Sequence, residues 1–186
     1  MPDEPEVYLE DVRRQFRGQK KLAEKAMGQI TDEQFFAALD RESNSIALMV
    51  KHVAGNLRSR WLDFYASDGE KPDRHRDGEF EIGAEDTRAS LMEKWEAAWK
   101  ILFDVVGPMT PPDLERTVTI RGEPHQAIRA LNRQLTHYAY HVGQIVFLAK
   151  HHAADHWQTL SIPRGKSEEV NARLRLRSKA ESDPKP

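Results

Sequence analysis

The stretch Leu135-Thr136-His137-Tyr138-Ala139-Tyr140-His141-Val142-Gly143-Gln144 lies in the middle of the longest helical pattern in the chain. His137 and His141 are four residues apart, so on a helix their rings lie one above the other on the same face. This spacing allows two imidazoles to bind one divalent metal ion, and a third ligand must come from another part of the chain. The pattern predicts a helix over residues 124–154 with Pro124 in its first turn. Its core stripe comprises Ile128, Leu131, Leu135, Val142, Ile145, Val146 and Ala149.

Three further helical patterns precede this one, over residues 7–27, 43–65 and 88–106. In each, apolar residues recur at intervals of three and four, which is typical of an amphipathic helix with one buried stripe. Asp86-Thr87 precedes the third pattern and Gly107-Pro108 follows it, as expected for the start and stop of a helix. Four long helices predict an all-α fold, a four-helix bundle whose long connections permit crossovers.

A short β-hairpin is predicted just before the last long helix, because residues 114–123 alternate in polarity and end in a glycine turn. The chain has 186 residues, enough for one domain with a hydrophobic core, which we expect over residues 1–167. From Glu168 the composition becomes charged and poor in large apolar groups. Residues 168–186 are therefore expected to form a flexible C-terminal tail.

Composition excludes several classes of protein. The formal net charge is −2, so no basic field argues for a nucleic-acid partner. The chain has no cysteine, which excludes disulfides, thiolate nucleophiles and cysteine metal ligands. The first residues are acidic and lack the apolar core of a signal peptide, and no apolar run is long enough to span a bilayer. We expect a soluble, cytoplasmic protein with no membrane partner.

The loop expected over residues 68–86 is rich in Gly, Pro and mixed charge. It is longer than most connections between helices, which favours a lid or a cover over one end of the bundle. The alternative is a solvated loop whose charges pair with one another. Two of its acidic residues, Asp77 and Glu79, are candidate general bases.

His52 is the candidate for the third metal ligand. It stands near the centre of the second helical pattern, in a stripe of short polar residues comprising Ser45, His52, Asn56, Ser59 and Asp63. The solvent face of so long a helix usually carries Lys, Glu and Arg, so this stripe resembles the wall of a polar cavity. An ordinary surface stripe is the alternative interpretation.

The His-x-x-x-His spacing alone is weak evidence, since the chain holds 8 histidines and contains a second such pair, His152 and His156. That second pair stands at the end of the helix, where exposure is expected. His137 and His141 are mid-helix among apolar residues, where unpaired imidazoles are costly. Either a metal ion satisfies them, or they are structural histidines bonded to Ser and Asn groups of the second helix.

Three neutral imidazoles leave the full charge on a divalent ion and at least one position open, which favours an anionic fourth ligand such as hydroxide, carboxylate or thiolate. Zn, Ni, Fe, Mn or Co can bind imidazole, and ligand type does not choose among them. Asn56 and Gln144 are candidates for orienting the rings or a bound water. Asp63 joins the two loop carboxylates as a candidate pocket residue and general base.

Two segments carry a resemblance to a known superfamily: His52-Val53-Ala54-Gly55-Asn56, and His137 to Gln144 in the stretch quoted first. The chain resembles the DinB/YfiT-like superfamily of bacterial metal-binding four-helix bundles over residues 22–167. His52, His137 and His141 match its three metal-binding histidines. Four further segments are similar to one uncharacterised branch: Trp61-Leu62-Asp63-Phe64, Asp68-Gly69-Glu70-Lys71, Arg76-Asp77-Gly78-Glu79-Phe80 and Leu160-Ser161-Ile162-Pro163-Arg164-Gly165-Lys166-Ser167.

The resemblance implies an up-down-down-up bundle, often a homodimer, that binds a divalent metal ion such as Ni or Zn. Characterised relatives include thiol S-transferases and a mycothiol-dependent maleylpyruvate isomerase. The loop motifs of this chain differ from those of the thiol transferases, so their substrate is an analogy.

Three hypotheses follow. The protein is a metal-dependent transferase or hydrolase that activates a small thiol or water, a non-catalytic, stress-related dimer that binds a metal ion or small ligand, or a bundle with purely structural histidines. Metal content separates the third hypothesis from the others.

Overall fold

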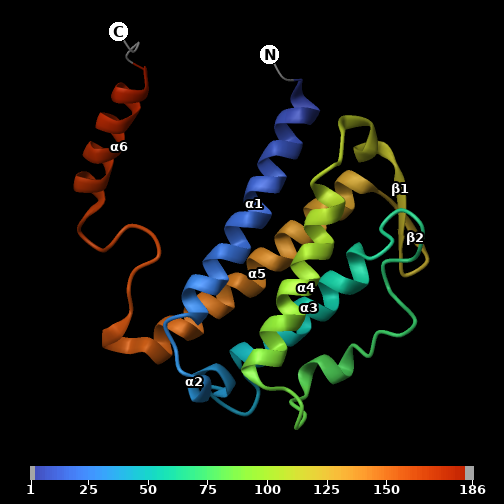
Figure 1. Ribbon diagram of the computed structural model, residues 1–186, viewed down its shortest axis with the longest axis horizontal. Helices are drawn as coiled ribbons and strands as arrows, with labels where there is room; N and C mark the ends of the chain where they lie inside the picture. The colour runs from blue at the N-terminus through green and yellow to red at the C-terminus, as the bar shows by residue number, and fades with distance from the viewer. Residues whose placement is uncertain (1–2, 183–186) are drawn as a thin grey trace.

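The computed structural model describes residues 3–182, with the backbone alone for 177–182. Within that range the chain is mostly helical, with one small two-stranded antiparallel sheet (Figure 1). The α-helices are α1 (Glu4–Met27), α2 (Asp32–Phe36), α3 (Ile46–Trp61), α4 (Arg88–Val106), α5 (Ala127–Ala153) and α6 (Ser167–Ser182). The strands are β1 (Thr117–Ile120) and β2 (Glu123–Gln126), and single turns of 3-10 helix form η1 (Asp77–Phe80), η2 (Pro111–Glu115) and η3 (Ala154–His156).

The four long helices α1, α3, α4 and α5 share one core. The closest packing is between α3 and α4 and between α1 and α5, and α3 also contacts α5 (Figure 1). Each of the four contributes a fully buried aromatic side chain to the centre: Phe16, Trp61, Trp99 and Tyr138. Tyr138 lies 6.0 Å from Phe16 and 5.6 Å from Trp99, measured between ring centroids. The core thus fixes α5 relative to the other helices directly beside its two histidines.

The helix boundaries agree with the local capping residues. Helix α4 spans Arg88–Val106 as predicted, because the Thr87 side chain accepts a hydrogen bond from the Ser90 amide. Helix α3 starts at Ile46, directly after Ser45, whose side chain caps it. The helix ends at Trp61, four residues before the predicted end at 65. Asp63 follows with a φ of 50°, a left-handed conformation that a helix does not accommodate.

The predicted hairpin is confirmed, and it corrects the start of the last long helix. Strands β1 and β2 pair through a turn at Arg121 and Gly122, both with positive φ. Pro124 lies in β2 opposite Thr119, so the prediction that it occupies the first turn of the helix was wrong. The pairing continues to Gln126, and α5 therefore starts at Ala127.

The C-terminal segment differs in part from the expected tail. Residues Ser167–Ser182 form α6, which lies apart from the four long helices in Figure 1, and residues 171–176 are exposed. The last four positions of the predicted tail, 183–186, lie outside the described residues. Over residues 3–182, no helix combines the length and the apolar character needed to cross a bilayer.

Candidate metal centre

His52 on α3 and His137 and His141 on α5 lie together, and one ligand atom from each falls within 4.8 Å of the others. His52 is buried, while His137 and His141 are half-buried. The Nε2 atoms of His137 and His141 are 3.1 Å apart, close to the separation of about 3.3 Å between two nitrogens on a tetrahedral zinc ion. The ring centroid of His52 is 5.5 Å from that of His137 and 5.0 Å from that of His141. The three rings can therefore hold one metal ion.

Hydrogen bonds at Nδ1 hold two of the rings in an orientation that suits metal binding. The Glu79 carboxylate accepts from Nδ1 of His52 at 2.8 Å, and the Gln144 amide oxygen accepts from Nδ1 of His141 at 3.0 Å. Both partners are acceptors, so each Nδ1 carries the proton and each Nε2 keeps its lone pair. Outer partners of this kind fix the tautomer of metal-binding histidines in general.

Burial keeps the two α5 rings neutral. It lowers the pKa of His137 to about 3 and that of His141 to about 4, and charge on the neighbouring imidazoles adds to the effect. A neutral imidazole is the form that binds a metal ion. A donor set of three imidazole nitrogens suits Zn, Ni, Fe or Co.

Glu79 is itself held by several contacts. Arg74 donates from Nε and Nη2 to its two carboxylate oxygens, both at 2.8 Å. Burial alone would raise the pKa of Glu79, but the hydrogen bonds from His52 and Arg74 outweigh burial and hold the pKa below its usual range. A carboxylate so engaged positions His52 and is not a free base. The ring of Phe80 also packs against His52, with 4.8 Å between the two ring centroids.

Gly55 makes the approach of Glu79 to α3 possible. A Cβ atom at position 55 would collide with the Glu79 carboxylate. Gly55 stands one helical turn from His52 on the same helix, and pairs three residues apart face the same side. A residue without a side chain is needed there because the carboxylate occupies the space.

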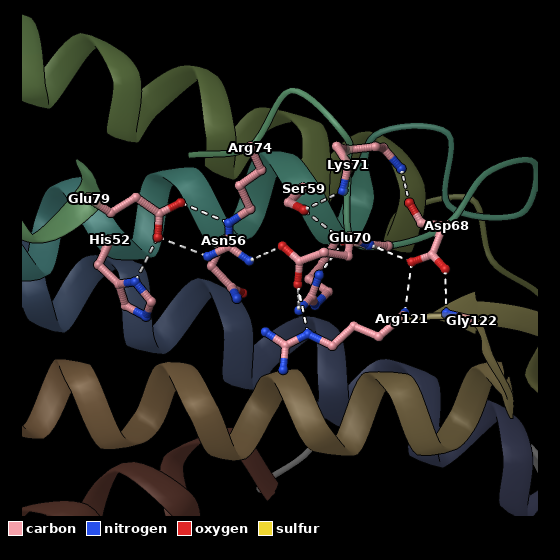
Figure 2. A network of polar contacts seen from close by, with 12 residues as sticks. His52, Asn56, Ser59, Asp68, Glu70, Lys71, Arg74, Glu79, Arg121 and Gly122 are labelled. Atoms are coloured by element: carbon pink, nitrogen blue, oxygen red, sulfur yellow. Dashed lines mark hydrogen bonds and ion pairs between the residues drawn. The ribbon is translucent and has the colours of Figure 1, made fainter. Parts of the chain in front are cut away.

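The loop between α3 and α4 forms a cover over this part of α3, as Figure 2 shows. Glu70 accepts from Arg60 at 3.0 Å, from Arg74 at 3.1 Å and from Arg121 at 2.9 Å. Asp68 accepts from the backbone amides of Arg121 and Gly122, which ties the loop to the hairpin turn. Of the two interpretations offered by the sequence, the structure favours the cover. Its charges pair with α3 and the hairpin and not only with one another.

The remaining predicted residues fall in different places. Asn56 is buried on α3, and its amide oxygen accepts from the Tyr138 hydroxyl at 3.2 Å and not from a histidine. Asp63 is exposed beyond the end of α3, so the structure does not bring it to the histidines. The Asp77 side chain is fully exposed. The third carboxylate considered as a general base, Glu79, is hydrogen-bonded through both oxygens to His52 and Arg74. None of the three therefore offers a free oxygen at the cluster.

The structure does not arrange His152 and His156 as a pair, and within residues 3–176 it gives the main cluster no Ser or Asn partner. His156 lies in η3 beyond the end of α5, so it does not share a helical face with His152. The Ser and Asn partners expected for purely structural histidines are engaged elsewhere: Ser59 bonds to the backbone of Gly69 and Lys71, and Asn56 to Tyr138. Among the described residues, the cluster of His52, His137 and His141 is the metal-binding candidate.

A cavity of about 220 Å³ adjoins the cluster and was not anticipated from the sequence. His52 and His137 form part of its wall, and the rest is strongly basic. Its five arginines are Arg60, Arg74, Arg76, Arg121 and Arg133. They come from α3, the loop, the hairpin turn and α5, and no sequence spacing connects them.

Comparison with known proteins gives one match. Residues 3–166 match a family model described as "Protein of unknown function (DUF1572)". No curated protein and no solved structure matches the chain.

Proposed function

Because the chain belongs to the DUF1572 family, whose function is unknown, we propose its function from the site: a metal-dependent enzyme that activates a small nucleophile, water or a thiol. The observation that carries the proposal is the convergence of His52, His137 and His141 with two Nδ1 atoms already hydrogen-bonded. Nickel or zinc is the expected ion, and iron, manganese or cobalt are alternatives.

The proposal includes the architecture. The pairing of α1 with α5 and of α3 with α4 supports a four-helix bundle of the DinB/YfiT-like type with up-down-down-up connectivity. Bundles build metal sites from inward-facing side chains of facing helices, and α3 and α5 supply the histidines here.

A divalent ion held by the three histidines would act as a Lewis acid and would lower the pKa of water or a thiol bound to it. The residues of the chain supply the rest. Glu79 and Gln144 keep two rings in the orientation that binding needs. Glu79 is engaged with both His52 and Arg74, so the chain's own contribution is to position and bind rather than to remove a proton.

Metal content of untagged protein tests the proposal. We expect about one equivalent of metal in the wild type after growth with Ni, Zn, Fe and Mn, and loss of it in His52→Ala and His137→Ala. His151→Ala is the matched control, since His151 is exposed on the same helix as His137. Wild-type protein without metal would rule the proposal out and favour structural histidines.

A second candidate is a non-catalytic, metal-binding homodimer. It is favoured by Tyr140 and Phe147, which are 64% and 67% exposed on α5 beside the site. They line a groove of about 480 Å³ that Gln144 also reaches. For such a protein, the His→Ala variants lose thermal stability together with the metal, because metal binding adds to the folding free energy. Turnover of thiol or ester substrates by the loaded wild type would exclude this candidate.

A further inference from the structure

Five arginines line the cavity beside the histidines, and the neighbouring carboxylates do not balance their positive charge. We propose that the cavity binds a small anion, a carboxylate or phosphate group carried by the substrate. This inference rests on the proposed function, because the metal centre forms one wall of the cavity through His52 and His137. The other walls hold five guanidinium groups.

The carboxylates nearby do not neutralise these arginines. Glu70 and Glu79 are the acidic partners in the network, and Arg74 uses Nε, Nη1 and Nη2 to hold both of them. Glu70 also accepts hydrogen bonds from Arg60 and Arg121. These two carboxylates, with the exposed Asp77 at 3.9 Å from Arg76, therefore face five cationic side chains, and an anion in the cavity would balance part of the excess.

Arg133 is the arginine best placed to bind a ligand. It is exposed on α5, one turn before His137, and no carboxylate of the described residues forms an ion pair with it. Arg76 also lines the cavity, and its closest acidic contact is a 3.9 Å pair with the solvent-exposed Asp77. A guanidinium group binds carboxylate or phosphate oxygens through two parallel hydrogen bonds.

Two buried groups of the cavity wall have unused hydrogen-bonding capacity. Gln134 is 3% exposed, and its amide oxygen has no hydrogen-bond partner among the described residues. Nε of Arg60, in a side chain that is 4% exposed, also lacks a partner there. Buried polar groups are paired in most structures, so unpaired ones in residues that line a cavity are consistent with a polar ligand. Nε of Arg60 is a donor for an anion, whereas the Gln134 oxygen is an acceptor and needs a hydroxyl or another donor on the same ligand.

The size of the cavity limits the ligand to a small molecule. A volume of about 220 Å³ is below the range of about 300–1,000 Å³ typical of pockets for drug-sized ligands. With its anionic group at Arg133, a short ligand reaches the wall formed by His137. The substrate class is therefore a small mono- or dianion whose reacting end lies next to the metal centre.

Calorimetric titration of the full-length protein with phosphate, malonate and the neutral malonamide, at constant ionic strength, tests the inference. We expect phosphate or malonate to bind both the metal-free and the metal-loaded protein, and malonamide to bind neither. Arg133→Gln should weaken binding of the anion about tenfold, as expected for loss of a charge-assisted hydrogen bond. Arg129→Gln is the matched control, since Arg129 is exposed one turn away on α5 and does not line the cavity. It should change affinity less than twofold.

The outcomes separate this inference from the proposed function. Binding of neither anion, equal binding of malonamide, or equal effects of the two arginine variants would overturn the anion site. Failure of the metal assay together with Arg133-dependent binding to metal-free protein would overturn the metal function and leave the anion site standing. Metal uptake without anion binding would overturn the anion site and leave the metal function standing.

Discussion

Nδ1 of His52 donates to the Glu79 carboxylate at 2.8 Å, although the two residues are 27 positions apart in the chain. The contact joins the centre of α3 to the η1 turn of the loop. It makes the loop part of the candidate metal centre, because the orientation of one candidate ligand depends on it. Loss of the carboxylate is therefore a sharp test of the site.

Glu79→Gln should lower metal affinity about 10- to 100-fold, the usual effect of removing a hydrogen-bond partner of a metal ligand. The amide keeps the size of the side chain but loses the charge that the His52 and Arg74 contacts use. Competition with a chromophoric chelator measures the affinity. Glu81→Gln, at an exposed position in the same loop, is the control. Equal affinities for the two variants would show that Glu79 does not position His52.

Gly55→Ala should also reduce metal affinity, because the added Cβ displaces the Glu79 carboxylate. Gly18→Ala is the matched control, since Gly18 is an exposed position of α1 with open space around it. That control should stabilise its helix by about 0.5–1 kcal/mol and leave metal affinity unchanged. The same chelator assay, with thermal unfolding beside it, separates the two effects. Unchanged affinity in the Gly55 variant would contradict the packing argument.

The metal-free protein should become less stable as the pH falls below about 6.5. The pKa values of His137 and His141 are lowered to about 3 and 4 in the folded state, while the unfolded chain takes up protons near the ordinary value of 6.5. The unfolded state thus binds more protons between these values, so the free energy of unfolding decreases through that window and is unaffected above it. Urea unfolding from pH 7.5 to 5 measures the slope. His141→Gln should make it shallower, and an unchanged slope would contradict the assignment.

Tyr138→Phe should reduce the free energy of unfolding by about 1–3 kcal/mol. The Tyr138 hydroxyl accepts from Nε1 of Trp61 at 3.0 Å and donates to Asn56 at 3.2 Å, and both partners are buried. Its removal leaves the indole N–H without a partner. Tyr140→Phe, at an exposed position on the same helix, should stay within about 0.5 kcal/mol of the wild type. Urea unfolding compares them, and equal losses would show that the buried chain of hydrogen bonds does not matter.

Local patterns in the sequence were enough to predict a mainly helical fold with a hairpin. Apolar spacing, the Thr87 cap and the Gly122 turn act over a few residues, and the structure confirms those elements. The error at Pro124 arose at a boundary, where pairing with Thr119 across the sheet outweighs the preference of proline for the first turn of a helix. Helical spacing also identified His137 and His141 as a pair on one face. A metal ion bound to them stays a prediction.

The surroundings of the histidines were decided by the tertiary structure alone. Glu79 was considered as a base from its place in the loop, and only the folded loop shows that it orients His52. The cavity arginines, from Arg60 to Arg133, come together from four separate elements. A helix repeats its faces every three to four residues, so ligands on one helix can be read from spacing. Contacts between a loop, a hairpin and two helices have no period in the sequence, because the packing of the core sets them.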